Sequence, residues 1–230
     1  MTGASRGIGA ATARMLDGEG ASVLRVSRGG DFACDVTEPD AAERILAECL
    51  HRFGRVDVLV NNAGTSRAAS LEELTDDDWR EQWELNVMAP MRLMRAIAPR
   101  MAEAGDGRIV NVASSSGKRP SPRNAAYSVT KAAELSLSRV FADRWAGEGV
   151  RINAVEPRAA VASEGAKALL GDRVDRVSTE PMEAMVEAAV ALCCCAPDLI
   201  GRNVVSLDLL DELSLPVMTL DGTAPYVSPP

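Results

Sequence analysis

The sequence has few of the features that mark an exported, membrane-bound or nucleic-acid-binding protein. It contains no apolar run close to the roughly 18 residues that a membrane helix needs. Its first residues lack the basic and apolar pattern of a signal peptide. A net charge of −8 argues against nucleic acid or an anionic membrane as the main partner. We therefore expect a cytoplasmic protein.

Cysteine and histidine are also too scarce, or too poorly spaced, to suggest a metal site. The five cysteines lie at positions 34, 49, 193, 194 and 195, without a C-x-x-C spacing. The three adjacent ones would point in different directions on a helix, so we expect small apolar residues in a reducing compartment. The single histidine, His51, is expected to be a surface or satisfied side chain. No bound metal is predicted.

The length and the order of the apolar segments favour one α/β domain. A chain of 230 residues with 47% hydrophobic and 25% charged residues is ordinary for a single globular domain. Strand-like and helix-like patterns alternate without repeats or a linker, which predicts a Rossmann-type doubly wound parallel sheet with helices on both faces. We expect residues 1–230 to form one dinucleotide-binding and catalytic domain. The tail, residues 208–230, is the part that is hardest to interpret.

A glycine-rich loop opens the chain. Gly3, Gly7 and Gly9 are spaced G-x-x-x-G-x-G and lead into a helical pattern from Ala10 to Leu16. Glycines let a backbone approach a phosphate, and the following helix N-terminus favours an anion. Such a loop normally follows a buried strand, but here Met1 directly precedes it. We therefore expect the first strand of the sheet to be missing from this sequence.

The segment after the first helix carries the evidence on cofactor choice. Ala21–Val26 is predicted to be a strand, and it is followed by Ser27 and Arg28. An acidic residue at this strand end favours NAD, whereas an arginine accommodates the 2′-phosphate of NADP. Arg28 therefore favours NADP over NAD, although a solvated Arg28 is the alternative. Phe32–Val36 follows too closely for a crossover helix and should be a short strand at the sheet edge.

The remaining elements follow from apolar runs and helix starts. A helix begins with Thr37 as N-cap and buries Ile45, Leu46, Cys49 and Phe53, and another begins at Thr75. The further predicted segments are the strands Val56–Val60, Arg108–Ala113, Val150–Val155 and Asn203–Leu207, the helices Ala125–Trp145 and Pro181–Cys195, and a lid segment over Ala159–Leu170.

Asn86 and Pro90 form a notable pair in the helix after Thr75. Proline has no N–H, so the carbonyl of Asn86 loses its helical partner and the helix should kink. The released carbonyl could hold a water beside a reaction site. A simple kink with solvent as the partner explains the pattern equally well.

The strongest chemical signal lies between Ser114 and Lys131. Tyr127 and Lys131 are four residues apart in a helical pattern, which places them on one face. A phenol is a poor acid–base group at neutral pH unless a nearby cation favours the phenolate, and the lysine supplies that cation. Ser114 follows a buried strand, and its hydroxyl could hold a substrate oxygen beside the phenol.

Together these motifs resemble the short-chain dehydrogenase/reductase family over residues 2 to about 207. The residues that carry the resemblance are Thr2-Gly3 to Gly7-Ile8-Gly9, Asp35-Val36, Asn61-Asn62-Ala63-Gly64, Asn86, Ser114, Tyr127 and Lys131. The resemblance implies hydride transfer between a nicotinamide cofactor and a carbonyl or alcohol substrate. Tyr127 would be the acid–base group, Ser114 would hold the substrate oxygen, Lys131 would bind the nicotinamide ribose and favour the phenolate, and Asn86 would keep a relay water.

The resemblance also implies a set of cofactor contacts. They are Gly3, Ser5, Arg6, Gly7, Ile8, Gly9, Ser27, Arg28, Asp35, Val36, Asn62, Ala63, Gly64, Tyr127, Lys131 and Pro157. Two departures affect this set. Arg158 follows Pro157 where the family has glycine, and Ala162 stands at the expected place of a threonine near the nicotinamide amide.

Two interpretations remain for the protein as a whole. The first is an active enzyme whose true start lies upstream of Met1. The second is a truncated, non-catalytic Rossmann-type protein that binds a nucleotide or a partner. The intact set of Ser114, Tyr127, Lys131 and Asn86 favours the first.

The helices also offer apolar surface for association. Trp79 and Trp83 lie at helical spacing and are expected in the core or at a subunit interface. The helix Ala125–Trp145 has more apolar positions than one sheet face needs. Since related enzymes pair these helices about a two-fold axis, we expect a homodimer or homotetramer.

Overall fold

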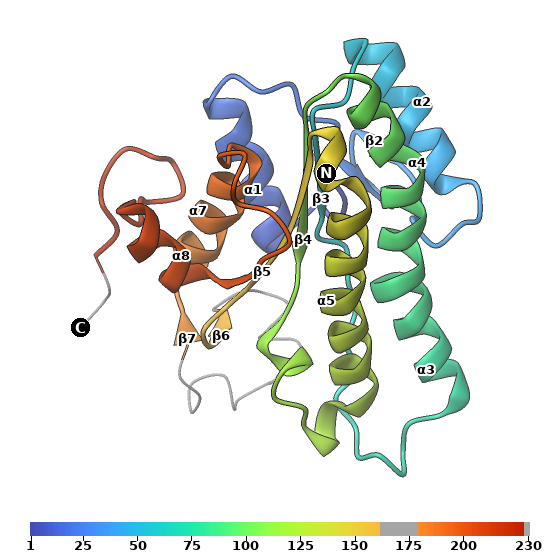
Figure 1. Ribbon diagram of the computed structural model, residues 1–230. Coiled ribbons are helices and arrows are strands. Elements are labelled where there is room, and N and C mark those ends of the chain that lie inside the picture. Colours follow the sequence, from blue (N-terminus) through green and yellow to red (C-terminus); the bar gives the residue numbers. More distant parts are fainter. Residues whose placement is uncertain (162–178, 228–230) are drawn as a thin grey trace.

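The computed structural model describes residues 1–161 and 179–227, and it places a parallel sheet between two layers of helices (Figure 1). The central strands are ordered β3-β4-β5-β8, and every pairing among them is parallel. Their bounds are β3 Val58–Asn61, β4 Gly107–Val112, β5 Val150–Glu156 and β8 Asn203–Val205. The predicted doubly wound architecture is therefore confirmed.

Two short strands extend this sheet beyond β3. β1 (Val26–Ser27) pairs in parallel with β2 (Phe32–Ala33). Thr2 forms a parallel bridge with Val26 and donates its backbone N–H to the carbonyl of Val60 at 3.0 Å. Residues 1–2 thus occupy the position between β1 and β3, and β2 is the edge stub that was expected, although it is shorter than predicted.

The prediction of a strand over Ala21–Val26 is wrong for all but its last residue. On one side of this segment the Met1 amino group donates to the carbonyl of Leu24 at 2.9 Å, and on the other side Phe32 donates its N–H to the carbonyl of Arg25 at 3.1 Å. A strand needs a neighbour that accepts and donates its backbone hydrogen bonds. Residues 21–25 have too little neighbouring strand to form a ladder.

The helices divide between the two faces of the sheet (Figure 1). α1 (Gly7–Gly18), α7 (Met182–Cys193) and α8 (Ser206–Leu213) enclose one apolar cluster with the sheet, which includes Leu16, Val155 and Met185. α2 (Ala41–Phe53), α4 (Ala89–Glu103) and α5 (Ala125–Trp145) enclose the other, which includes Ile97, Ile109 and Ile152. Alternate residues of each strand feed the two clusters.

The helix before α4 contains a wide turn at the place where a kink was expected. α3 (Asp76–Trp83) begins with Thr75 as N-cap, as predicted, in a capping box with Asp78. It continues into a π-helical turn over Glu84–Met88, and α4 follows with Pro90 in its first turn. Proline cannot donate to the preceding turn, and a π-turn is a known way to accommodate that loss. Short 3₁₀ turns cover Ser115–Gly117, Pro122–Asn124 and Ala146–Glu148.

Several predicted boundaries need correction. α2 begins at Ala41, because Thr37 donates its backbone N–H and its hydroxyl to Asp35 and does not cap the helix. The last strand ends at Val205, and Ser206 starts α8, so part of the tail is an ordered amphipathic helix. Beyond α8 the chain forms a small antiparallel bridge between Met218 and Pro225.

The predicted lid segment is only partly covered by the structure. Ala160–Val161 form β6, which pairs in parallel with β7 (Thr179–Glu180). Residues 162–170 of that segment, including Ala162, lie outside the described residues.

Further expectations concern cysteines, metals and membranes. All five cysteines are thiols, with Cys193 and Cys195 buried and Cys194 exposed. Burial raises the pKa of Cys193 to about 12, as expected for a packing residue. Over residues 1–161 and 179–227 there is no cluster of His, Cys, Asp and Glu suited to a metal ion, and no helix with the length and apolarity to span a bilayer.

Candidate functional site

The glycine loop packs against the residues that follow β3. Gly3 has a φ of +64°, and a Cβ there would lie 2.7 Å from the Asn62 Nδ2 and 2.9 Å from the Ala63 Cα. A Cβ on Gly9 would collide with the Gly3 carbonyl and with Asn62. The first and third glycines of the motif are therefore required by close packing within the site.

Thr2 and Asn62 fasten this loop to the sheet. The Thr2 hydroxyl oxygen accepts hydrogen bonds from the backbone N–H groups of Asn62 and Ala63, each at 3.1 Å. The Asn62 side chain donates to the carbonyls of Thr2 and Gly3, each at 3.1 Å. The loop and the end of β3 are thus fixed in one arrangement, which brings Gly3, Gly9 and Asn62 together.

The start of α1 has the features of an anion site. Gly7 is the first helical residue, with a φ of +56° and open space where a Cβ would stand. Its N-cap Arg6 makes no capping hydrogen bond through its side chain, and the first turn carries no acidic side chain. The first N–H groups of the helix are therefore available, and the helix dipole favours a phosphate there. This end of the molecule fits the pyrophosphate of a dinucleotide.

Asp35 is held as an ionised acceptor at the end of β2. Its Oδ1 accepts from the Thr37 N–H at 3.0 Å and from the Thr37 hydroxyl at 2.7 Å. The backbone N–H of Thr37, followed by its hydroxyl, lowers the pKa of Asp35. Such a carboxylate can accept from an amino group such as that of adenine.

Arg28 is the exposed cation beside Asp35. Its charge contributes, after the Thr37 hydrogen bonds, to the lowered pKa of the Asp35 carboxyl. Arg25 forms ion pairs with Asp17 and Asp31, whereas Arg28 forms none within the described residues. The Oγ of Ser27 is buried and has no hydrogen-bond partner among the residues that the structure describes. Ser27 and Arg28 can therefore serve a ligand at the end of β1.

Lys131 lies at the centre of the predicted catalytic residues. Its ammonium donates to the carbonyl of Val112 at 2.9 Å and to Oε2 of Glu134 at 2.6 Å, and it lies 5.7 Å from the centre of the Tyr127 ring. Burial alone would lower the pKa of Lys131, but the charges of Glu134 and Tyr127 outweigh burial and raise it. The lysine is therefore a positive charge beside the phenol, as the sequence predicted.

Asn86, on the π-helical turn, is near Gly64, as is the Lys131 ammonium. A Cβ on Gly64 would lie 3.3 Å from the Asn86 Oδ1 and 3.9 Å from the Lys131 Nζ. The Asn86 amide binds both the N–H and the carbonyl of Thr65, each at 2.9 Å, and donates to the Thr130 hydroxyl at 3.0 Å. The Asn86 side chain is thus occupied with positioning its neighbours.

Ser114 follows β4 and is half-buried. It lies between Val112, whose carbonyl binds Lys131, and Gly117, which packs against the backbone of Lys131 and Ala132. Its Oγ accepts from the Ser116 N–H at 3.2 Å. Because the oxygen is an acceptor there, the hydroxyl proton remains available for a substrate oxygen.

Tyr127 lies in the first turn of α5 and is also half-buried. Within the described residues its hydroxyl forms no hydrogen bond, while its carbonyl accepts from the Thr130 hydroxyl at 2.9 Å. The phenol is therefore available for proton exchange. The Lys131 ammonium thus lies near Gly64 and the Tyr127 ring, Asn86 also lies near Gly64, and Ser114 is on the adjoining loop.

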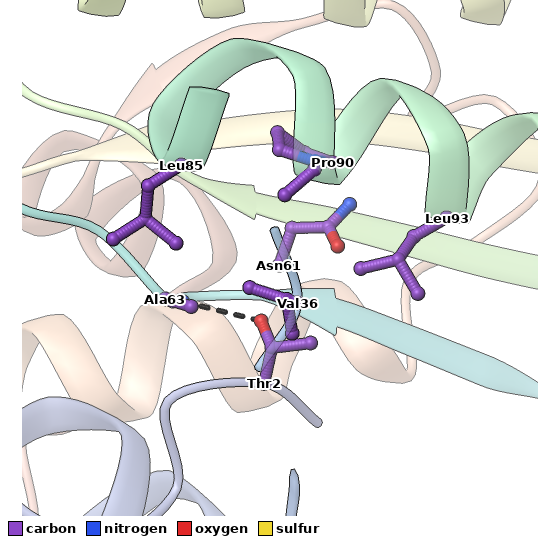
Figure 2. Close-up of a pocket in the computed structure, with 8 residues that line it drawn as sticks. Thr2, Val36, Asn61, Ala63, Leu85, Pro90 and Leu93 are labelled. Atoms are coloured by element: carbon purple, nitrogen blue, oxygen red, sulfur yellow. Dashed lines mark hydrogen bonds between the residues drawn. The ribbon is translucent and has the colours of Figure 1, made fainter. Parts of the chain in front are cut away.

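The hollow in Figure 2 adjoins this region but is separate from it. It is lined by Thr2, Val36, Asn61, Ala63, Leu85, Ala89, Pro90 and Leu93. Val36 and Ala63 belong to the predicted cofactor contacts, whereas Ser114 and Tyr127 are absent from the lining. The hollow is a packing gap between the end of β3 and α4, and proton transfer at Tyr127 would occur elsewhere.

The other predicted contacts differ in how the structure places them. Ser5 is exposed and Ile8 half-buried, both at the start of α1. Pro157 directly follows β5 at the carboxyl edge of the sheet. The next residue, Arg158, donates its N–H to Glu180 at 2.7 Å and pairs with Asp208. Arg158, which stands where the family has glycine, is thus held by two acidic residues, Glu180 and Asp208.

The sequence analysis missed Thr130 and Glu134. Thr130 is fully buried and binds Asn86, while Glu134 binds Lys131. The spacing of Glu134 three residues after Lys131 was a signal for an ion pair. It did not indicate that the pair is buried.

Comparisons with known proteins identify the family of this chain. The family model for short chain dehydrogenases matches residues 30–174. A D-threitol dehydrogenase of Mycolicibacterium smegmatis is 36% identical over 193 residues, which cover 76% of this chain and 74% of that enzyme. A 3-oxoacyl-(acyl-carrier-protein) reductase of Vibrio cholerae is 34% identical over 172 residues, or 68% of this chain and 70% of that enzyme.

Solved structures share the fold of this chain. A putative NAD(P)-dependent gluconate 5-dehydrogenase from Beutenbergia cavernae, with NADP bound at low occupancy, superposes with a TM-score of 0.81. It is 33% identical, and the match covers 89% of this chain and 92% of that one. A putative short-chain dehydrogenase/reductase from Burkholderia xenovorans gives a TM-score of 0.79 at 31% identity, with the same coverage of both chains.

Proposed function

Because the chain belongs to the short-chain dehydrogenase family and is an NAD(P)-dependent oxidoreductase, we propose that it transfers a hydride between NADP(H) and a small carbonyl or alcohol substrate. The observation that carries the proposal is the position of the Lys131 ammonium. It lies 5.7 Å from the centre of the Tyr127 ring, and a Cβ on Gly64 would lie 3.9 Å from it.

The residues that would hold the cofactor are those whose geometry fits its parts. The start of α1 fits the pyrophosphate, because Gly7 is open and the first turn carries no acidic side chain. Asp35 fits the adenine amino group, and Arg28 with Ser27 fits a 2′-phosphate. Arg28 and Ser27, with no acidic residue at the end of β1, favour NADP over NAD.

The bound nicotinamide supplies the hydride or accepts it. Tyr127 takes the hydroxyl proton when an alcohol is oxidised and returns a proton to the oxygen when a carbonyl is reduced. Ser114 donates a hydrogen bond to the same oxygen and so holds it beside the phenol. The ammonium of Lys131 favours the phenolate form of Tyr127 and has a donor left for a ribose hydroxyl.

Asn86 serves this chemistry through position. Its side chain forms hydrogen bonds with Thr65 and Thr130, so the π-helical turn is held in a fixed position relative to α5. The Asn86 amide already uses both N–H donors and one acceptor site, which favours a relay water on the main-chain carbonyl of that turn.

The experiment that tests the proposal is an assay with a panel of ketones and alcohols. Absorbance of the reduced nicotinamide reports turnover with NADPH or NADH in one direction and with the oxidised cofactors in the other. We expect at least one carbonyl or secondary alcohol to be turned over. Tight cofactor binding without turnover of any ketone, aldehyde or alcohol in a broad panel would contradict the proposal.

A further inference from the structure

The buried carboxylate of Glu134 touches the predicted machinery but has no part in the chemistry described so far. Its Oε2 lies 2.6 Å from the Nζ of Lys131, and the two side chains are only 3% and 5% exposed. A carboxylate and an ammonium are seldom both buried this completely, because removing the two charges from water costs several kcal/mol per ion. The location matters as well, since the same ammonium faces the Tyr127 ring.

The hydrogen bonds of the ammonium show what Glu134 does to it. An ammonium has three N–H donors. One is used by the Val112 carbonyl at 2.9 Å and one by Glu134 at 2.6 Å. A single donor therefore remains for a ligand. The two fixed acceptors come from different elements, β4 and α5, so they hold the nitrogen at one point in the site.

Glu134 also acts through its charge. A carboxylate beside the ammonium offsets part of the positive charge that reaches the phenol. We propose that Glu134 is a positioning residue that anchors the Lys131 ammonium and moderates its effect on Tyr127, so that it sets the pH at which the phenol loses its proton. This inference rests on the proposed function, because it assigns Tyr127 as the acid–base group.

The surrounding charges do not offer an alternative source for this effect. On elements packed against α5, Asp78 of α3 pairs with Arg67, Glu84 of the π-turn with Arg92, and Glu156 of β5 with Lys118. Glu81 of α3, Arg95 of α4 and Arg123 in the turn before α5 are exposed to solvent. On α4, Arg100 pairs with Glu103, and in the turn after α5 Glu148 pairs with Arg144. Within the described residues, only Lys131 and Tyr127 join Glu134 in a shared electrostatic group.

The titration behaviour of the pair agrees with the geometry. Burial raises the pKa of Glu134 more than the neighbouring ammonium lowers it. The charge of Glu134, together with that of Tyr127, outweighs burial and raises the pKa of Lys131. The ionisation of each group therefore depends on the other, and the raised pKa of Lys131 favours its ammonium form.

The test is a spectroscopic titration of the phenol that needs no substrate. The chain has two tyrosines, Tyr127 and Tyr226. In a Tyr226→Phe background, the rise of tyrosinate absorbance with pH reports Tyr127 alone. Glu134→Gln keeps an acceptor oxygen for Lys131 but removes the charge, so we expect the midpoint to fall by about one pH unit. Glu134→Asp keeps the charge and should leave the midpoint near that of the parent.

The same tyrosinate titration provides the control and the result that would contradict the inference. Glu81→Gln removes a carboxylate from an exposed position of α3 and should not move the midpoint. Glu134→Met, which needs no buried acceptor, replaces Glu134→Gln if the amide impairs folding. An unchanged or higher midpoint in a folded Glu134 variant without the charge would overturn the inference. Absence of turnover in the parent would instead overturn the proposed function, and the two failures are therefore distinguishable.

Discussion

The side chain of Asn86 donates a hydrogen bond to the hydroxyl of Thr130 at 3.0 Å and so joins the π-helical turn to the helix that carries Tyr127 and Lys131. Both residues are fully buried. The Thr130 hydroxyl in turn donates to the carbonyl of Tyr127 at 2.9 Å. This chain of contacts holds the first turn of α5 in place, so the phenol has a fixed position although its own hydroxyl is unengaged within the described residues.

The buried pair of Lys131 and Glu134 should be visible in stability. Lys131→Met leaves a buried carboxylate without its counter-ion, and we expect the free energy of unfolding at pH 7 to fall by about 3 kcal/mol. The double variant Lys131→Met with Glu134→Gln should recover most of that loss while remaining inactive. Urea unfolding measures the free energy of unfolding of the parent, both single variants and the double variant. A double variant as unstable as Lys131→Met would contradict it.

The loss in Lys131→Met should also depend on pH. Because burial raises the pKa of Glu134 above its ordinary value of 4.5, the folded chain holds that proton more tightly than the unfolded chain. The destabilisation that the unpaired Glu134 carboxylate causes in Lys131→Met is therefore complete above the raised pKa of Glu134. It disappears as pH falls toward 4.5. We expect the stability gap between Lys131→Met and the double variant to narrow from pH 7 to pH 5. A gap that widens over this range would show that another group causes the loss.

Ser114 should matter for the chemical step and little for folding. Its hydroxyl is half-buried and makes one local hydrogen bond, to Ser116. Ser114→Ala removes a donor to the reacting oxygen, so we expect a cost of about 2–4 kcal/mol in kcat/KM. Ser115→Ala, on the same turn, is the matched control and should stay close to the parent. Steady-state kinetics on any substrate that is turned over decides between them.

Arg28 should determine the choice of cofactor. Thermal shifts with NADPH should exceed those with NADH at equal concentration, because Arg28 can pair with the additional phosphate. Arg28→Asp should reverse the order by repelling that phosphate and accepting from a ribose hydroxyl. Arg25→Gln is a useful comparison, because Arg25 is already paired with Asp17 and Asp31. Equal shifts with the two cofactors in the parent would refute the NADP assignment.

Association should use the exposed apolar residues of α3 and α5. Val140 and Val129 on α5 and Trp83 on α3 are 61%, 47% and 42% exposed. Since apolar patches of this kind commonly mark interfaces, we expect a homodimer or homotetramer, and Val140→Arg should dissociate it. Light scattering at micromolar concentration measures the mass. A monomeric parent would count against this prediction.

The sequence was informative where local pattern determines structure. The helix Ala125–Trp145 was predicted with its observed bounds, because its apolar spacing and its start are local features. The Thr75 cap and the irregularity before Pro90 were predicted for the same reason. Ser206 and Leu207 were wrongly assigned to the last strand, and residues 208–213 were left uninterpreted, although the amphipathic sequence of 206–213 carried a usable helical signal.

Other features depended on contacts that the sequence does not display. Ala21–Val26 has the composition of a strand, but a strand forms only where a neighbour can pair with it. Glu134 has the spacing of an exposed ion pair, and only the packing of α5 against the sheet shows that it is buried. The motif residues could therefore be identified from the sequence, whereas the neighbouring residues that position them, such as Glu134, could not.

The central claim is that Tyr127 carries the proton, and Tyr127→Phe tests it most directly. The ring still packs while the proton carrier is lost, so we expect turnover to be abolished with nearly unchanged affinity for the cofactor. Tyr226→Phe, which alters the other tyrosine, should retain activity. Turnover is followed by absorbance of the reduced nicotinamide, and affinity by quenching of protein fluorescence. If Tyr127→Phe retains most of the activity of the parent on any substrate, another group carries the proton and the account is wrong.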